Sequence, residues 1–177
     1  MARGLDSTDL AILRLLTEAP RAGAREFARR LGIARGTVQA RLDRLQRDGV
    51  VVNFVPQISP AAMGFGGLAF VHVHLAQGRL DETSRLLADI PEILEMNSIA
   101  GEGDLLCRVV ARDNADLETV LQRMIGTPGV VRTRAEIVLS RRIQPRIRSL
   151  IDALATGSTT ADTYDRSETV RPQYPQR

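Results

Sequence analysis

The stretch AREFARRLGIARGTVQARLDRL, residues 24–45, decides the fold of the first part of the chain. Its spacing is typical of two short helices joined by a sharp turn, because Ala28 is followed after four residues by Gly32 and after six more by Val38. A small side chain at Ala28 lets the two helices cross closely, and Gly32 supplies the positive φ that a sharp turn needs. Val38 then packs the second helix against the first. The stretch therefore predicts a helix-turn-helix.

Hydrophobic periodicity extends this unit in both directions. Before the stretch, apolar residues recur at helical spacing, and Pro20 ends that helix. Within the second helix of the motif, Val38, Leu42 and Leu45 form a buried stripe at i, i+4 and i+7. We expect helices over residues 6–18, 24–31 and 35–48, a short strand over residues 50–55, and a linker marked by Pro56 and Pro60.

The basic residues are unevenly distributed along the chain, and all 24 of them are Arg. Residues 1–50 hold ten Arg and six acidic residues, whereas residues 51–130 hold five Arg and ten acidic residues. Eight of the arginines lie between residues 21 and 47, where Glu26 and Asp43 are the acidic residues. A basic concentration at one end indicates that this end meets a polyanion. A solvated surface on a plain three-helix bundle is the alternative.

The buried stripe leaves the start of the second motif helix and one of its faces exposed. In a helix-turn-helix this end enters the major groove of DNA. Gln39 can pair with adenine, and an Arg with guanine, through two hydrogen bonds each. Gly36 lets the helix start lie close to the duplex, and arginines farther along can hold phosphates. The candidate DNA-binding residues are Arg35, Gly36, Thr37, Gln39, Arg41 and Arg44.

The second half of the chain changes to a strand pattern. The run LAFVHVHL, residues 68–75, is apolar and rich in β-branched residues. We expect strands over residues 68–75, 93–99, 105–111 and 130–139, and helices over residues 80–90 and 114–125. The order β-α-β-β-α-β is that of a ferredoxin-like domain, in which helices cover one face of a four-stranded antiparallel sheet. The other face stays bare, so we expect a homodimer.

The expected class is therefore α+β. The predicted division is a helix-turn-helix domain with its linker at residues 1–60, a βαββαβ domain at 61–142, a C-terminal helix opened by Pro145 at 143–155, and a disordered polar tail at 156–177. Cys107 is the single cysteine, so no disulfide forms within the chain. A leader sequence is not apparent, and no apolar run approaches the roughly 20 residues of a membrane span, so we expect a cytoplasmic protein.

Two histidines alternate on the first strand of the second half. His72 and His74 point to the same face and could bind a metal ion, but a third ligand is not evident. We therefore favour a packed pair with no metal. The sequence contains no Gly-rich phosphate loop, nucleophile elbow or paired Cys motif, so we expect neither catalytic residues nor a cofactor.

From about residue 5 to residue 142 the sequence resembles the Lrp/AsnC (feast/famine) family. The similar segments are Leu5-Asp6-x-x-Asp9-x-x-Ile12-Leu13, Phe27-Ala28-Arg29-Arg30-Leu31-Gly32-Ile33, Val38-x-x-Arg41-Leu42-x-x-Leu45-x-x-x-Gly49-Val50-Val51, Gly101-x-x-Asp104-Leu105-Leu106 and Ile137-Val138-Leu139. They resemble, in order, the opening helix, the turn, the recognition helix with its exit strand, a loop of the sensor domain and its last strand. The chain departs from the family at Ala34, where a Ser usually starts the recognition helix, and at Ala135, where Thr is frequent.

The resemblance implies a sequence-specific DNA-binding regulator with a winged helix-turn-helix and a RAM/ACT-like ferredoxin domain. That domain would dimerise and assemble four dimers into an octamer, and an amino acid or a related small molecule would bind between dimers. The implied effector residues are Gly101, Glu102, Gly103 and Asp104. The residues agree with this, because the glycines leave backbone N–H groups open to a carboxylate and Asp104 can hold an ammonium group. A plain hairpin turn is the alternative.

Two other functions stay open. The sirohaem decarboxylases resemble this family in architecture, and the His72/His74 pair keeps an enzyme of that kind as the alternative. Such an enzyme has no need of an Arg-rich helix face. A sensor that acts through protein partners alone is the third interpretation. The charge distribution favours the regulator, which is not an enzyme.

Overall fold

The computed structural model describes residues 4–157, which form two compact units. Among the described residues, the helical unit consists of residues 4–55 and 143–157, and the sheet unit consists of Pro56–Arg142. Each unit has its own hydrophobic core. Within residues 4–157, no helix is long and apolar enough to span a membrane.

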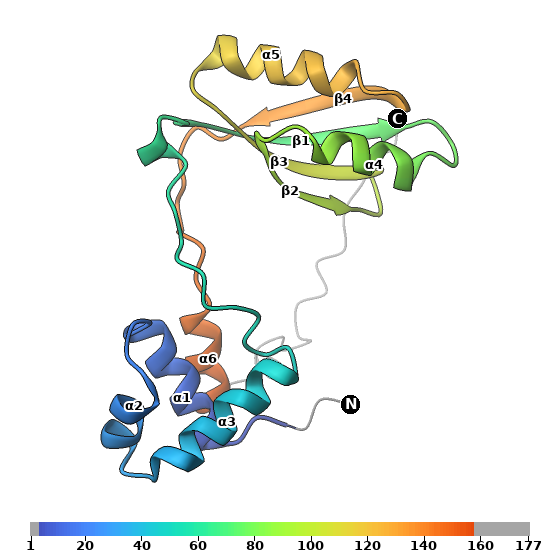
Figure 1. Ribbon diagram of the computed structural model, residues 1–177. Helices are drawn as coiled ribbons and strands as arrows, with labels where there is room; N and C mark the ends of the chain where they lie inside the picture. The colour runs from blue at the N-terminus through green and yellow to red at the C-terminus, as the bar shows by residue number, and fades with distance from the viewer. Residues whose placement is uncertain (1–3, 158–177) are drawn as a thin grey trace, which may run out of the picture. The chain divides into compact units, whose positions relative to one another are not determined.

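The helical unit begins with the three predicted helices, α1 (Ser7–Glu18), α2 (Ala24–Leu31) and α3 (Arg35–Arg47), as Figure 1 shows. Their packing follows the predicted spacing. Gly32 ends α2 with φ of 67°, and the buried Ala28 and Val38 lie in the core between the helices. Leu42 and Leu45 complete the buried stripe of α3. The helix-turn-helix prediction is confirmed.

The strand predicted over residues 50–55 is not formed. The backbone N–H groups of Val50 and Val51 both donate to the carbonyl of Leu45, at 2.9 and 3.0 Å, and Gly49 adopts φ of 73°. These bonds close the C-terminal end of α3, as a left-handed residue after a helix commonly does. The N–H groups of Val50 and Val51 therefore bond to the end of α3 and are not available for pairing with another strand. The apolar composition of residues 50–55 led to the wrong prediction of a strand.

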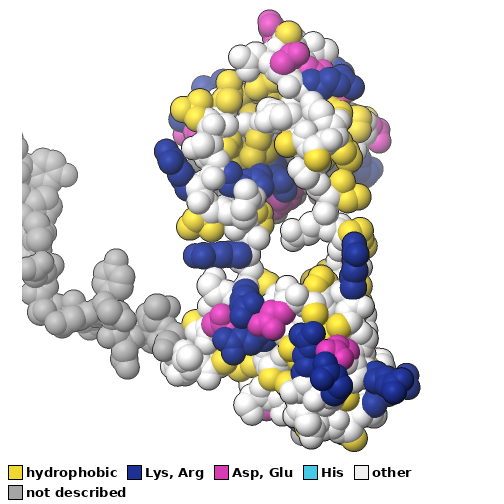
Figure 2. Space-filling model, turned by 90° about the vertical axis from the view of Figure 1, so that its left-hand side faces the viewer, with side chains coloured by type: hydrophobic (Ala, Val, Ile, Leu, Met, Phe, Trp, Pro, Cys, Tyr) yellow, Lys and Arg dark blue, Asp and Glu magenta, His cyan; other side chains and the backbone are white. Residues whose placement is uncertain are grey.

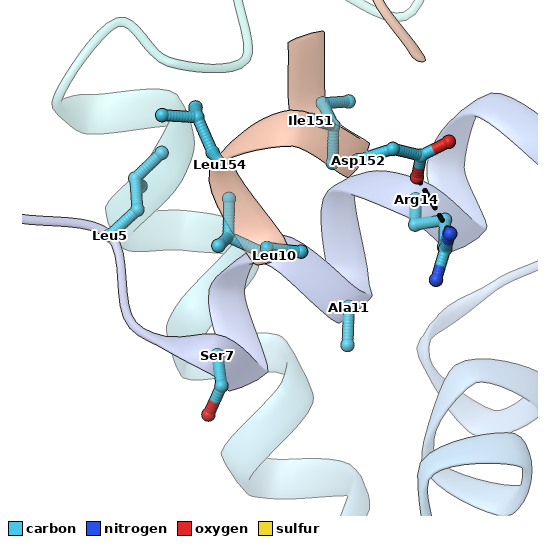
Figure 3. Close-up of a pocket in the computed structure, with 9 residues that line it drawn as sticks. Leu5, Ser7, Leu10, Ala11, Arg14, Ile151, Asp152 and Leu154 are labelled. Carbon is cyan, nitrogen blue, oxygen red and sulfur yellow. Dashed lines mark ion pairs between the residues drawn. The ribbon is translucent and has the colours of Figure 1, made fainter. Parts of the chain in front are cut away.

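A further helix, α6 (Arg148–Ala155), belongs to the helical unit and packs against α1. Its Ile151 is 6% exposed and joins the core formed by α1, α2 and α3. Ion pairs of 2.8 Å between Arg14 and Asp152 and of 2.7 Å between Arg148 and Glu18 lie beside this contact. Figure 3 shows the adjoining pocket of about 380 Å³, which side chains of α1 and α6 line together with Leu5.

This last helix is shorter and less buried than its sequence predicts. It begins at Arg148 instead of Pro145, because the carbonyl of Ile147 accepts the first bonds of the helix, from the N–H groups of Leu150 and Ile151. Of the predicted apolar stripe, Ile151 is buried, whereas Ile147, Leu150 and Leu154 are exposed. The predicted disordered tail lies, from residue 158 on, outside the described residues.

The sheet unit has the predicted βαββαβ order, which confirms the α+β class. After a short 3-10 turn at Ala61–Met63, its elements are β1 (Gly67–Leu75), α4 (Leu80–Ala88), β2 (Ile93–Ser98), β3 (Leu105–Ala111), α5 (Asn114–Ile125) and β4 (Val130–Ile137). The strands are antiparallel in the order β2-β3-β1-β4 (Figure 1). Several ends differ from the predicted ones by up to two residues, where helices and strands fray.

The two faces of the sheet have different chemistry. On one face, buried side chains such as Val71, Val73 and Cys107 pack with Leu87 of α4 and Val120 of α5. The other face carries the alternate residues of each strand, since side chains of a strand point to opposite sides. These residues include Phe70, His72 and His74 on β1, Leu106 and Arg108 on β3, and Arg132, Arg134 and Glu136 on β4.

Candidate nucleic-acid interface and effector-binding loop

The start of α3 is exposed and carries no side-chain cap. Its N-cap residue is Ala34, which has no group to bond the first backbone N–H groups of the helix. These donors, together with the positive end of the helix dipole, are open to an anion such as a phosphate. The predicted contact residues Arg35, Gly36, Thr37 and Gln39 are all exposed here. Figure 2 shows Arg side chains, with acidic side chains between them, over the helical unit.

The other two predicted contact residues are engaged within the unit. Arg41 donates from Nη1 to both oxygens of Asp6, at 2.7 and 2.6 Å, and to Oδ1 of Asp9 at 2.9 Å. Arg44 donates from Nη2 to Oδ2 of Asp9. We call this group of four residues, Asp6, Asp9, Arg41 and Arg44, the carboxylate clamp. It joins α3 to the N-terminal end of α1.

The two carboxylates of the clamp also cap α1. The N–H of Asp9 donates to Oδ1 of Asp6 at 2.9 Å, and the N–H of Asp6 donates to Oδ2 of Asp9 at 3.1 Å, which is a reciprocal capping box. The hydrogen bond from Arg41 is the main cause that lowers the pKa of Asp6 to about 2, and it raises the pKa of Arg41. Asp9 is 0% exposed, and the two arginines that bind it compensate its buried carboxylate.

Other polar side chains of the unit are also paired. Glu26 binds both Arg29 and Arg30 at 2.7 Å, and these hydrogen bonds lower the pKa of Glu26 to about 2. The side-chain amide of Gln39 donates to Oδ1 of Asp43 at 2.8 Å, one turn farther along α3. Four exposed arginines between residues 21 and 47 have no acidic partner within 4 Å in the described part of the chain, namely Arg21, Arg25, Arg35 and Arg47.

Sequence reasoning missed part of this arrangement. It did not select Arg21 and Arg25 as contact candidates, although they stand in the Arg-rich segment. It also did not pair Asp6 and Asp9 with α3. The spacing of Asp6 and Asp9 indicates a capping box, but no local signal joins them to arginines more than 30 residues away.

The β2–β3 loop holds the four predicted effector residues and is fixed to β1. Gly101 and Gly103 adopt φ of 133° and 95°, which L side chains rarely adopt. A Cβ at Gly103 would lie 3.3 Å from the carbonyl oxygen of Val73, so the loop approaches β1 closely. The side chain of Glu102 pairs with Arg134 at 2.6 Å, and this hydrogen bond lowers the pKa of Glu102.

Asp104 ends this loop and is held by backbone bonds. Its N–H donates to the carbonyl of Val73 at 2.9 Å, and its Oδ2 accepts from the N–H of Leu75 at 2.7 Å. Asp104 also lines a pocket of about 230 Å³, bordered by Leu75, Ala76, Gln77, Gly78, Leu80, Ser98 and Ile99. The structure therefore places one of the four predicted effector residues on this pocket, and the other three in the turn beside it.

The two histidines belong to a polar network on the face of the sheet away from the helices. The Nδ1–H of His72 donates to the carbonyl of Glu102 at 2.9 Å, and Arg132 donates to Nε2 of His74 at 3.0 Å. Arg134 joins Glu102 to Glu136 at 2.6 and 3.2 Å. Among the described residues, no group of three His, Cys, Asp or Glu side chains is placed to hold a metal ion.

The chain matches known proteins along most of its length. Residues 5–52 match the family model of the winged helix-turn-helix DNA-binding domain, and residues 68–147 match that of the Lrp/AsnC ligand binding domain. The HTH-type transcriptional regulator FL11 of Pyrococcus horikoshii is 32% identical over 135 residues, which cover 76% of this chain and 89% of that protein. The regulator AldR of Mycolicibacterium smegmatis is 32% identical over 141 residues, which cover 77% and 82%.

Solved structures agree with these matches. The feast or famine regulatory protein Rv3291c of M. tuberculosis, complexed with L-methionine, is 34% identical with a TM-score of 0.73, covering 81% of this chain and 98% of that one. AsnC of E. coli shares the fold at 22% identity with a TM-score of 0.77, covering 82% and 99%. The helix-turn-helix, the βαββαβ sheet unit and the matches to both domains lead to one conclusion: the chain belongs to the Lrp/AsnC family and is a DNA-binding transcriptional regulator with a ligand-binding domain.

Proposed function

We propose that this regulator reads specific DNA sequences with the N-terminal end of α3 and responds to an amino acid bound at the sheet unit. The observation that carries the first part is the exposed, uncapped start of α3 with Arg35, Gly36, Thr37 and Gln39 on it. Arg21 and Arg25, which precede α3, and Arg47 at its C-terminal end supply phosphate contacts, because they are exposed and carry no acidic partner in the described part of the chain.

The test of DNA reading compares two duplexes. One is selected from random sequence by repeated binding to the full chain, and the other is a random 30-base-pair duplex. The chain is expected to prefer the selected duplex, and Gln39→Ala is expected to reduce that preference more than it weakens binding to the random duplex, since Gln39 pairs with a base. An equal loss on both duplexes would remove Gln39 from the base-reading set.

The amino-acid proposal rests on Asp104 and its pocket. Asp104 is exposed there, and one of its oxygens is left free by the bond from Leu75, so the carboxylate has room to hold an ammonium group. The turn glycines beside it, Gly101 and Gly103, leave backbone N–H groups for a carboxylate, and Glu102 lies between them. The similar M. tuberculosis protein was solved with L-methionine, which makes an amino acid the first ligand class to test.

A thermal-shift screen of the twenty amino acids tests this proposal, because a ligand that prefers the folded state raises the melting temperature. Asp104→Asn keeps an acceptor for the N–H of Leu75 and removes the charge. We expect this variant to lose the shift given by the wild-type ligand. The control is Asp81→Asn, an exposed carboxylate at the start of α4. If Asp104→Asn responds like the control, Asp104 does not hold the ligand.

We also propose that the regulator forms a homodimer and that the dimers assemble to an octamer. The support is the sheet face opposite α4 and α5, on which Phe70 is 39% exposed beside the polar network of His72 and His74. A sheet face that the helices of its own unit leave uncovered is open to a partner, and an apolar side chain on it adds apolar area that a partner can bury. Sedimentation of wild type and Phe70→Glu tests this, and a monomeric wild type at micromolar concentration would refute it.

An enzyme resembling the sirohaem decarboxylases is the weaker candidate. The relatives that match this chain are named as transcriptional regulators. His72 and His74 are engaged by Glu102 and Arg132. Absorbance spectra of the purified protein with a tetrapyrrole separate the two functions, since a binding enzyme would shift the absorption band and the proposed regulator would not.

A further inference from the structure

The carboxylate clamp changes the role of Arg41 and Arg44, the two predicted contact residues in the second half of α3. We infer that Asp6 and Asp9 are positioning residues for DNA recognition: they bind Arg41 and Arg44, fix the rotation of α3, and keep these two arginines away from DNA phosphates. The inference rests on the proposed function, in which the start of α3 reads the duplex. It assigns no base or phosphate contact to Arg41 and Arg44.

The geometry of the clamp is that of a two-point attachment. Oδ1 of Asp9 binds Arg41 and Oδ2 binds Arg44, so the two oxygens of one carboxylate hold two side chains that are three residues apart on α3. Asp6 binds Arg41 a second time through both of its oxygens. Together with the buried stripe of Val38, Leu42 and Leu45, these two attachments nearly one turn apart fix which face of α3 is turned outward.

The burial of Asp9 makes the attachment hard to exchange. Its side chain is 1% exposed, while those of Arg41 and Arg44 are 27% and 30% exposed. Removing the cationic partners of a buried carboxylate strongly destabilises the folded protein, because an uncompensated charge stays buried. An arginine that left Asp9 for a phosphate of DNA would leave that charge behind. The clamp also contains two positive and two negative charges, so it adds no net charge to the DNA-facing surface.

Rotation of α3 matters because the candidate base readers lie on the same helix. Gln39 stands two residues before Arg41, and Arg35 stands at the first position of α3. A base contact through two hydrogen bonds depends on both direction and distance. A helix that turns about its axis moves these side chains together out of register with the base edges. The clamp therefore acts on specificity, and the unclamped arginines act on affinity.

The first experiment counts phosphate contacts with the full chain and a random 30-base-pair duplex. Each arginine–phosphate contact contributes about 0.9 to the slope of log Kd against log salt. Arg25→Gln is expected to lower the slope by about 0.9, whereas Arg41→Gln and Arg44→Gln leave it unchanged. If Arg41→Gln and Arg44→Gln lower the slope as Arg25→Gln does, the two arginines contact phosphates and the inference is wrong.

The second experiment releases the clamp. Asp9→Asn keeps the size of the side chain and removes its charge, and circular dichroism selects a temperature at which the variant is fully folded. We expect its preference for the selected duplex over the random one to fall by about 10-fold, which is the loss of one well-placed base contact. Its salt slope on the random duplex is expected to rise, since Arg44 loses its carboxylate partner and becomes available to phosphates, whereas Asp6 still holds Arg41.

A matched control removes a carboxylate charge outside the clamp, at the C-terminal end of α3. Asp48 is the exposed C-cap residue, and Asp48→Asn is expected to strengthen binding to both duplexes equally. A folded Asp9→Asn that behaves like this control would show that Asp9 only stabilises the fold, and would refute the inference. If Asp9→Asn does not fold, Arg44→Gln takes its place, because it removes one of the two attachments through Asp9 at a side chain that is 30% exposed.

The proposed function and the inference fail in different ways. A wild-type chain that does not distinguish the two duplexes refutes sequence reading by α3. The salt slopes on the random duplex still decide in that case whether Arg41 and Arg44 contact phosphates. A wild type that distinguishes the duplexes, with a folded Asp9→Asn that distinguishes them equally well, refutes the positioning role alone.

Discussion

Replacing Ile151 with alanine is expected to loosen the DNA-reading helices, although residue 151 lies about a hundred residues away from them in the sequence. Ile151 is the one side chain of α6 that is buried in the core of the helical unit, at 6% exposure. Truncating a buried Ile to Ala costs about 2–5 kcal/mol through lost burial and the cavity left behind. The open pocket beside Ile151 lets water fill part of that space, so we expect the lower half of this range, about 2–3 kcal/mol.

The ion pairs beside Ile151 do not change this expectation. Arg14, Asp152 and Arg148 are all at least one-third exposed. Exposed ion pairs contribute about 0–1 kcal/mol each. The buried side chain therefore dominates the contact between α1 and α6.

Hydrogen exchange read by mass spectrometry on the full chain measures the effect separately in each unit. A loss of about 2–3 kcal/mol lowers the protection of core amides in α1–α3 by about 30- to 150-fold. Peptides from β1–β4 should not change, because they belong to the other core. The matched control is Leu150→Ala, one residue earlier and 57% exposed. We expect it to change protection by less than about threefold. Equal effects of the two variants would refute the packing of α6 on α1.

Three further predictions concern single residues. The pKa of Asp6 is lowered from 3.8 to about 2, so the stabilising effect of its carboxylate is complete above pH 4 and is lost as the pH falls toward 2. In urea unfolding from pH 5 to 2, the free energy of unfolding should depend less on pH in Asp6→Asn than in wild type. An unchanged pH dependence would contradict the ion pair with Arg41. Gly129→Ala would place a Cβ 2.1 Å from the buried Oγ1 of Thr83 at φ of 94°, and should destabilise the sheet unit by at least about 2 kcal/mol. Gly78→Ala, at φ of 74° with open space around it, should cost only about 1 kcal/mol, so calorimetry that finds equal losses would rule out the clash. Burial raises the pKa of Cys107 to about 11, so a thiol reagent at pH 8 should label it only after denaturation, and rapid labelling of the folded protein would show that the thiol is accessible.

The helices and strands of both units could be predicted because the patterns that indicate them lie within short stretches of the sequence. Val38, Leu42 and Leu45 repeat with the period of a helix, and all three are buried. The run of residues 68–75 is apolar with β-branched residues, and it forms β1. Periodicity of this kind reflects which side of an element meets the core, so a short window of sequence records it. The order of the elements then restricts the topology to few arrangements.

The errors occurred where the structure of a segment depends on a partner that its own composition does not reveal. Residues 50–55 have the composition of a strand, but a strand forms only beside another one, and the N–H groups of Val50 and Val51 bond to the end of α3. The apolar stripe of α6 predicts a buried face, yet the position of α1 decides that Ile151 alone is buried. The composition of a segment shows which of its side chains are apolar. Whether those side chains are buried depends on which other elements of the fold lie beside them.

The same limit applies to charge, with consequences for how the DNA interface is identified. Counting within residues 21–47 finds eight arginines and two acidic residues, which suggests a surface with six spare positive charges. Asp6 and Asp9, supplied from α1, neutralise Arg41 and Arg44, and Glu26 is shared by Arg29 and Arg30. What remains without an acidic partner among the described residues is Arg21, Arg25, Arg35 and Arg47. An arginine that is paired with a carboxylate must give up that ion pair before it can bind a phosphate. It therefore contributes less binding free energy to a phosphate contact than an unpaired arginine does. Contact arginines in a helix-turn-helix should therefore be chosen by their partners in the folded unit, and their number should be read from the salt dependence of binding.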